Sequence, residues 1–143
     1  MARIKIDLPE KFHFSTTIPI RITDVNYGGH VGNDTVLTII HEARVRFLKT
    51  FGYKELDLDG VGLIMADAGI EFKNELFYGD VVIASVAVAD FSKVGFDIYY
   101  KLEKEIDGKK LLVASAKTGM ICYDYERKKI VAVPEKAVGR LGA

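Results

Sequence analysis

The feature that most restricts the fold of this chain is a polar, glycine-rich loop followed by a long apolar helical pattern. From Asn33 to Phe51, apolar residues recur at the i, i+3, i+4 and i+7 spacing of one helix face. We predict Asn33 as the N-cap of this helix and Gly52 as the residue that ends it. A helix this apolar depends on tertiary burial, so we expect a curved sheet wrapped around it.

Most of the remaining chain carries β-strand patterns. The run from Phe14 to Thr23 is rich in β-branched residues, and its Pro19 favours an edge strand or a bulge. Turn signals such as Asp107-Gly108 separate the later runs. We predict further strands over residues 61–77 (one strand or a bent pair), 79–91, 95–106, 110–125 and 129–133. The expected fold class is α+β, with one long helix wrapped by a five- or six-stranded antiparallel sheet.

Composition and charge narrow the functional classes. The chain is 49% hydrophobic and 28% charged, and its 143 residues fit one domain, residues 1–143, with 1–13 as an N-terminal arm. Twenty basic and twenty acidic residues leave no formal net charge, which argues against non-specific binding of nucleic acid or anionic membranes. The single cysteine, Cys122, lies in an apolar strand pattern and is expected to be buried. We find no signal-peptide core and no membrane-spanning run, and therefore expect a cytoplasmic protein.

The loop and helix carry a motif that resembles a known family. Residues 21–33 read RITDVNYGGHVGN, and EAR follows at 42–44. This is similar to the R-x-x-D-x-D-x-x-G-H-V-N-N pattern of the hotdog-fold acyl-CoA and acyl-ACP thioesterases, the 4-hydroxybenzoyl-CoA thioesterase-like superfamily. The runs at 70–73 (IEFK) and 79–81 (GDV) resemble a second, weaker motif. The resemblance covers roughly residues 14–125. It implies the hotdog fold, hydrolysis of an acyl thioester of CoA or acyl carrier protein, and a homodimer or homotetramer.

Asn26 departs from the family pattern. Bacterial members that resemble this chain carry their catalytic carboxylate at this position, and an amide cannot act as a general base. Asp24 matches the first acidic position, and Gly32 replaces the first Asn of the family's Asn pair. Plant acyl-ACP thioesterases of the family use Asn and His in this loop, so the resemblance still implies a functional loop.

Four residues are candidates for catalysis: Asp24, Asn26, His30 and Glu42. His30 could act as a base or donate to the thioester oxygen, Asp24 could orient it, and Asn26 could hold a water. Turn and cap roles are the structural alternatives for these loop residues. Glu42 lies among apolar helix residues, so we expect a buried carboxylate that supplies the base. An ion pair with Arg46, four residues on, is its structural alternative.

Other residues are candidates for binding substrate. Backbone N–H groups at a helix N-terminus can stabilise an oxyanion, and glycines let the backbone approach closely. Asp67, inside an apolar run, could reach the site across a dimer interface, and Lys93 could pair with CoA phosphates. The substrate-binding candidates are Gly28, Gly29, Val31, Asn33, Asp67 and Lys93.

Two other functions are open at this point. Hotdog enoyl-thioester hydratases carry D-x-N-P-x-H, which residues 24–26 match in part, but here the spacing to His30 is one residue longer and the Pro is missing. The second is a non-catalytic acyl-thioester-binding protein, which Asn26 in place of the usual Asp would favour. No cluster of His, Cys and carboxylate residues has metal-ligand spacing, so we expect neither a metal nor a cofactor other than the CoA or carrier protein of the substrate.

Overall fold

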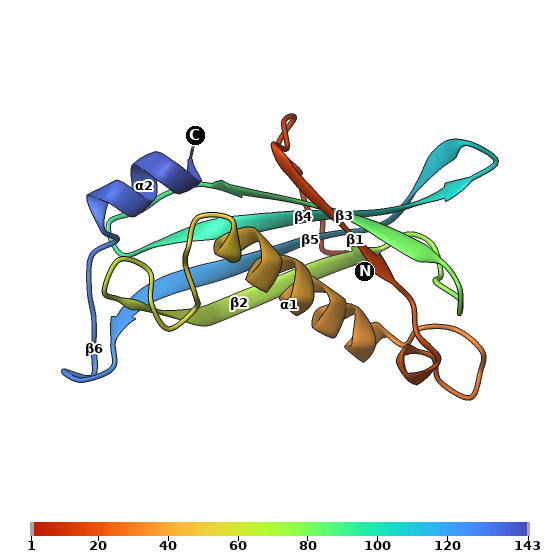
Figure 1. The fold of residues 1–143 in the computed structure, drawn as a ribbon, viewed down its shortest axis with the longest axis horizontal. Coiled ribbons are helices and arrows are strands. Elements are labelled where there is room, and N and C mark those ends of the chain that lie inside the picture. Colours follow the sequence, from red (N-terminus) through yellow and green to blue (C-terminus); the bar gives the residue numbers. More distant parts are fainter. Residues whose placement is uncertain (1, 143) are drawn as a thin grey trace.

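In the computed structural model, which describes residues 2–142, a long helix lies across one face of a six-stranded antiparallel sheet (Figure 1). This is the α+β architecture expected from the sequence. No helix within these residues is long and apolar enough to cross a membrane. In chain order the elements are β1 (Phe14–Pro19), the 3-10 helix η1 (Ile22–Asp24), α1 (Asn33–Lys49), β2 (Gly62–Phe72), β3 (Val81–Ala89), β4 (Gly95–Ile106), β5 (Lys109–Asp124), β6 (Lys129–Ile130) and α2 (Glu135–Leu141).

The sheet order is β1-β3-β4-β5-β2, and the short β6 pairs with β5. The two strands that flank α1 in sequence therefore lie at opposite edges of the sheet, and the predicted edge position of β1 is confirmed. The predicted turn at Asp107-Gly108 joins β4 to β5, and both residues have positive φ angles, 53° and 78°. The register of β2 against β5 shifts between Met65 and Asp67, so β2 is a single strand with a bulge.

The helix α1 begins and ends close to the predicted residues. Its N-cap is Gly32, and the prediction of Asn33 as the cap was wrong by one residue. At the other end, the Gly52 N–H donates to the Lys49 carbonyl at 2.9 Å and the Tyr53 N–H donates to the Leu48 carbonyl at 3.0 Å. With Gly52 at φ +78°, these two bonds form the glycine-based helix ending that the sequence predicted.

Two elements differ from prediction. The first strand ends at Pro19 instead of Thr23, because the Asp24 carboxylate accepts the Arg21 N–H at 2.8 Å and folds the chain into η1. The helix α2 was not predicted, and its Ala137 and Leu141 join the core. Seven residues are too few to show a helical period clearly.

Residues 2–13, which precede β1, have no regular structure but contact the sheet. The Ile6 N–H donates to Glu71 of β2 at 2.5 Å, and the Lys101 ammonium lies 4.9 Å from the centre of the Phe12 ring. Since Lys101 is on β4, the arm runs from β1 across to β2 over the sheet face opposite α1. The other face, with α1 on it, is left to form the site.

Candidate active site

The loop between η1 and α1 is a compact turn held by its own groups. The Asn26 N–H donates to the His30 carbonyl at 3.0 Å, and the Gly29 N–H donates to the Asn26 carbonyl at 3.0 Å. The Asn26 side-chain oxygen accepts the Gly28 N–H at 2.9 Å, a turn to which the short Asn side chain is well suited. Gly29 has a φ of +88°, where a larger residue would be strained. These contacts fix the loop and set the position of His30.

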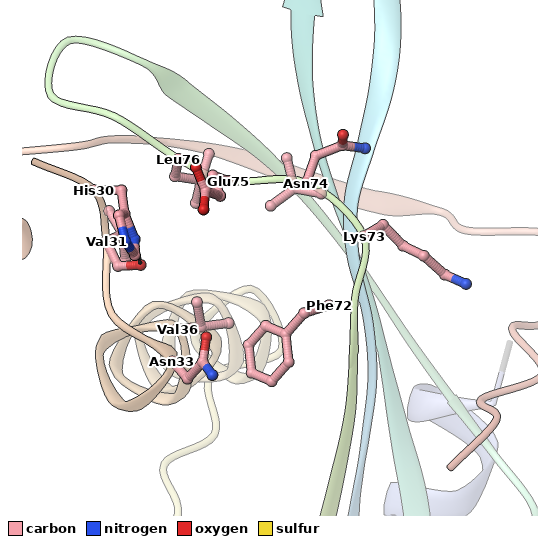
Figure 2. Close-up of a pocket in the computed structure, with 10 residues that line it drawn as sticks. His30, Val31, Asn33, Val36, Phe72, Lys73, Asn74, Glu75 and Leu76 are labelled. Carbon is pink, nitrogen blue, oxygen red and sulfur yellow. Dashed lines mark hydrogen bonds between the residues drawn. The ribbon is translucent and has the colours of Figure 1, made fainter. Parts of the chain in front are cut away.

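A second loop, residues 73–80 between β2 and β3, lies beside the first. The Val31 N–H donates to the Leu76 carbonyl at 2.8 Å, and His30 forms an isolated antiparallel bridge with Phe77. Between the two loops and the start of α1 is a cavity of about 220 Å³ (Figure 2). Its walls are His30 and Val31, the first turn of α1, the end of β2, residues 73–76 and Val113 of β5.

The cavity contains two groups that can accept a proton. The His30 Nδ1 lies 3.2 Å from the Val31 carbonyl, and a carbonyl only accepts, so this contact assigns the ring hydrogen to Nδ1 and leaves a lone pair on Nε2. The second group is the Glu75 carboxylate. Figure 2 shows it on the cavity side of its loop, whereas the side chains of Lys73 and Asn74 turn away.

The N-terminus of α1 faces the same cavity through Asn33, the first residue of the helix. The helical hydrogen bonds begin with the N–H groups of Thr35 and Val36, which donate to the Gly32 carbonyl at 3.1 and 3.2 Å. The N–H groups ahead of these have no acceptor within the helix and lie at the positive end of its dipole. Of these groups, the Asn33 N–H belongs to a residue that lines the cavity, so the start of α1 offers a backbone donor suited to a negatively charged oxygen.

Asp24 and Glu42 lie apart from this cavity, in a cleft of about 160 Å³ between β1 and α1. Besides closing η1, Asp24 pairs with the Arg21 guanidinium at 3.4 Å. Glu42 has a half-exposed side chain that pairs with Arg46 at 2.9 Å, so the expected buried carboxylate was wrong and the ion-pair alternative holds. The position of Glu42 around the helix explains the difference. The buried face of α1 runs through Ile39, Ile40, Ala43 and Phe47, and Glu42 lies outside this face.

Asn26 lies next to His30 across Gly28 and does not line the cavity. A methyl group at Gly28 would stand 3.0 Å from Asn26 Oδ1 and 3.8 Å from His30 Nε2. The lack of a side chain at residue 28 therefore keeps the approach to the His30 ring open. Asn26 shapes this approach through its turn, whereas Val31 and Asn33 line the cavity themselves.

Asp67 and Lys93 are not brought to this cavity within the chain. Asp67 accepts hydrogen bonds from the Lys117 ammonium and the Gly119 N–H, both at 2.9 Å, and these bonds hold the pKa of Asp67 below its usual value. Lys93 lies in the turn between β3 and β4, at the opposite end of β3 from the 73–80 loop. Its carbonyl accepts the Val133 N–H at 2.9 Å.

Sequence comparison gives the family. Residues 20–141 match the profile of the Thioesterase-like superfamily. The chain belongs to this superfamily. Among its relatives, the 1,4-dihydroxy-2-naphthoyl-CoA hydrolase of Microcystis aeruginosa is 30% identical over 126 residues, which are 86% of this chain and 88% of the relative.

Solved structures of thioesterases share the hotdog fold of this superfamily member. A 4-hydroxybenzoyl-CoA thioesterase mutant in complex with 4-hydroxybenzoyl-CoA superposes with a TM-score of 0.81 at 17% identity, covering 90% of this chain and 98% of that one. A 1,4-dihydroxy-2-naphthoyl-CoA thioesterase from Synechocystis superposes with a TM-score of 0.77 at 20% identity, covering 90% and 96%. The hotdog fold predicted from the motif is thereby confirmed.

Glu75 is a carboxylate of this cavity that the sequence did not suggest. Residues 61–77 were predicted as strand, and a strand position would carry no special interest. The strand ends at Phe72, and the next residues form the loop that meets His30. One signal was present, because Lys73, Asn74 and Glu75 are three consecutive polar residues that break the alternation of apolar and polar residues before the Gly79-Asp80 turn.

Proposed function

We propose that this member of the thioesterase-like superfamily hydrolyses an acyl-CoA thioester to a free acid and CoA. The observation that carries the proposal is the cavity where His30, Glu75 and the first turn of α1 meet. Such a site combines proton acceptors with backbone donors for an oxyanion, the two requirements of attack on a thioester carbonyl.

The acyl group we propose is compact and aromatic. The relatives are named for 1,4-dihydroxy-2-naphthoyl-CoA and 4-hydroxybenzoyl-CoA, both aromatic acyl thioesters. An apolar cavity of roughly 150 Å³ can bind benzene, so the cavity of about 220 Å³ has room for one aromatic ring. Phe72, Val36 and Val113 supply apolar walls for it.

The proposed reaction begins with a water held between His30 Nε2 and the Glu75 carboxylate. Glu75 takes one proton from this water as its oxygen bonds to the thioester carbonyl carbon. The negative charge that develops on the carbonyl oxygen is stabilised by the N–H groups at the start of α1. The carbon–sulfur bond then breaks, the acid is released, and the proton held by Glu75 passes to the CoA thiolate or to solvent.

This assignment predicts which carboxylate matters. Glu75→Gln keeps the size of the side chain but removes the base, and kcat for benzoyl-CoA should fall by about 100-fold or more. His30→Ala should cost at least about 10-fold, because it removes one acceptor for the water. The measurement is thiol release from benzoyl-CoA, 4-hydroxybenzoyl-CoA, saturated acyl-CoAs and an acyl-ACP.

The matched control is Glu126→Gln. Glu126 lies in the exposed turn between β5 and β6, so the kcat of this variant should equal that of the unmodified protein. Glu42→Gln tests the rival base. If Glu42→Gln lost activity while Glu75→Gln kept full activity, the base would lie on α1 and the assignment of Glu75 as the base would be refuted. Tight binding without thiol release would favour an acyl-thioester-binding protein. Loss of the double bond of crotonyl-CoA without thiol release would favour a hydratase.

We also propose that the protein assembles at least as a homodimer through β2. Within residues 2–142, the only strand partner of β2 is β5, and on its other edge the Leu63 N–H donates to the Glu55 carbonyl at 2.6 Å while the rest of that edge has no strand beside it. The helix α1 packs on β1 and β3, and leaves Met65 and Phe72 of β2 each 47% exposed. A free edge beside exposed apolar side chains is a surface that another chain can cover.

A further inference from the structure

Lys104, on β4, has a buried ammonium group that the proposed reaction does not use. Only 9% of its side chain is exposed. Its Nζ donates to the Glu75 carbonyl at 2.8 Å and to Asp80 Oδ2 at 3.0 Å, and it lies 5.1 Å from the centre of the Phe77 ring. A buried ammonium is unfavourable unless its hydrogens find acceptors. Here every one of these contacts is with the 73–80 loop.

The same loop is fixed at both of its ends by other groups. Its start is held by the Lys73 and Asn74 N–H groups, which donate to the Val113 carbonyl at 2.8 and 3.1 Å. Its end is closed by Asp80, whose carboxylate accepts the Phe77 N–H at 2.9 Å. Glu75 lies between these two ties, and Lys104 holds it by its carbonyl. One ammonium group therefore joins the closed turn at Asp80 to the residue that faces the cavity.

We propose that Lys104 is a positioning residue that holds the Glu75 carboxylate at its place opposite His30. The inference rests on the proposed function, because it concerns the geometry of the proposed base. Displacement of a reacting group by about 1 Å can lower a rate by about 100-fold. A tether on the backbone of Glu75 controls such a displacement without touching the substrate.

The test is Lys104→Met, which keeps an unbranched apolar side chain and removes the charge. We expect kcat for the best acyl-CoA to fall by about 10-fold or more, with KM within about 2-fold of the unmodified protein. The matched control is Lys101→Met, on the same strand. Lys101 contacts Phe12 and Glu103 and none of the 73–80 loop, so its variant should retain full kcat.

A double-mutant cycle separates positioning from general stability. If Lys104 acts through Glu75, adding Lys104→Met to Glu75→Gln should lower kcat no further. An equal fold-loss in both backgrounds, or a full kcat in Lys104→Met, would overturn the proposal. Should Lys104→Met fail to fold, Asp80→Asn provides the second variant, since it removes the charge that Lys104 pairs with.

Amide hydrogen exchange keeps this inference distinct from the proposed function. Lys104→Met should speed exchange within residues 74–80, whereas Lys101→Met should not. If the unmodified protein releases no thiol from any thioester, the proposed function fails, and exchange still tests the tether. Unchanged exchange in Lys104→Met would show that Lys104 does not hold the loop, whatever the activity.

Discussion

Cys122 illustrates how the surroundings of one residue set its chemistry. It lies on β5 with no exposed surface, and burial raises the pKa of its thiol to about 11. The thiolate is the reactive form, and a rise of two pKa units lowers its fraction by roughly 100-fold. We therefore expect Cys122 to react with an aromatic disulfide reagent at pH 8 at least about 100-fold more slowly in the folded protein than in urea. Absorbance of the released thiolate measures both rates.

The same shift gives a pH dependence of stability with a definite sign. The unfolded thiol loses its proton near its ordinary pKa of 9.0, whereas the folded thiol keeps it up to about 11. Stability from this group is therefore complete below pH 9 and declines as the pH rises toward 11. Cys122→Ala should remove this part of the slope. Rapid labelling of the folded protein at pH 8 would contradict the assigned burial.

At this scale the sequence predicted residue types better than residue positions. The loop from Asp24 to Asn33 was singled out because Asn, Gly and His in a short run have few purely apolar uses, and three of its residues (His30, Val31 and Asn33) line the cavity. The expected burial of Glu42 was wrong, since its side chain is half exposed, whereas the carboxylate that lies at the cavity is that of Glu75. Which face of a helix is buried depends on its partners, and a shift of one residue along α1, a rotation of about 100°, decides whether a side chain is buried.

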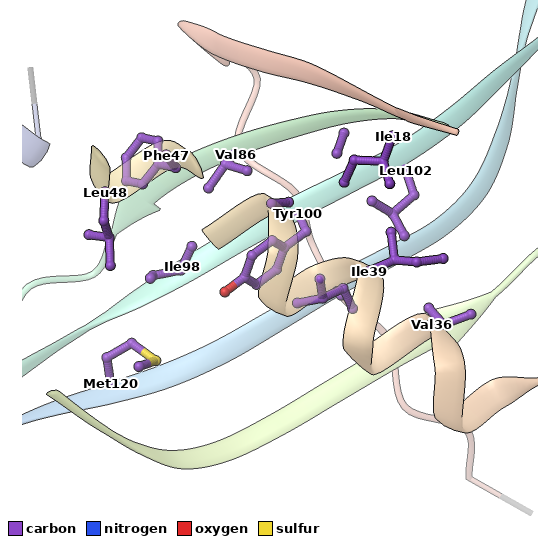
Figure 3. Close-up of a cluster of buried hydrophobic side chains, with 14 of the residues drawn as sticks. Ile18, Val36, Ile39, Phe47, Leu48, Val86, Ile98, Tyr100, Leu102 and Met120 are labelled. Carbon is purple, nitrogen blue, oxygen red and sulfur yellow. The ribbon is translucent and has the colours of Figure 1, made fainter. Parts of the chain in front are cut away.

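At the scale of elements, α1 is held to the sheet by a polar contact as well as by its apolar face. Arg44 Nε donates to Glu55 Oε1 at 2.7 Å, and its Nη1 donates to the Tyr100 hydroxyl at 3.2 Å. That hydroxyl also lies 2.7 Å from Thr118 Oγ1. Figure 3 shows Tyr100 between the strands and α1, among the buried apolar side chains. The guanidinium thus joins the helix, β4 and the segment after the helix.

Loss of this contact should destabilise the fold. Arg44→Ala leaves a void and removes the donor of Glu55 and Tyr100, so we expect the free energy of unfolding to fall by about 2–4 kcal/mol. Arg44→Met fills the space without the charge and should cost less. Urea unfolding followed by circular dichroism measures both. Arg127→Ala is the control, because its pair with Asp124 is exposed and such pairs contribute about 0–1 kcal/mol. An equal, small loss in all three variants would refute the role of Arg44.

The elements themselves could largely be predicted from periodicity and turn chemistry. The bounds of β4 match the prediction, and Gly52 ends α1 as expected. Two of the errors have causes other than hydrophobic patterning. Asp24 ends the first strand early, and the bulge at Met65 depends on pairing with β5. Neither effect has a signature in hydrophobic periodicity.

At the scale of the whole molecule, the cavity beside His30 is a consequence of strand order. Because β1 pairs with β3, the loop after β1 lies beside the loop before β3, and His30 meets residues more than 40 positions later in the chain. The family motif predicted the fold, but it says nothing about contacts between loops. Glu75 and Lys104 therefore entered the site only with the tertiary structure.

The proposed dimer is the prediction that belongs to this scale. The unmodified protein should elute with at least twice the 15.9 kDa mass of one chain in size-exclusion chromatography with light scattering. Met65→Glu places a charge on the exposed part of β2 and should shift the protein toward the monomer, because burying an unpaired carboxylate is costly. The matched control is Ile106→Glu. Ile106 is 48% exposed at the tip of the β4–β5 hairpin, so this variant should leave the mass unchanged. A monomeric parent protein, or a Met65→Glu variant of unaltered mass, would exclude assembly through β2. Thiol release measured on the separated monomer and dimer then tells whether the cavity works alone or needs the second chain.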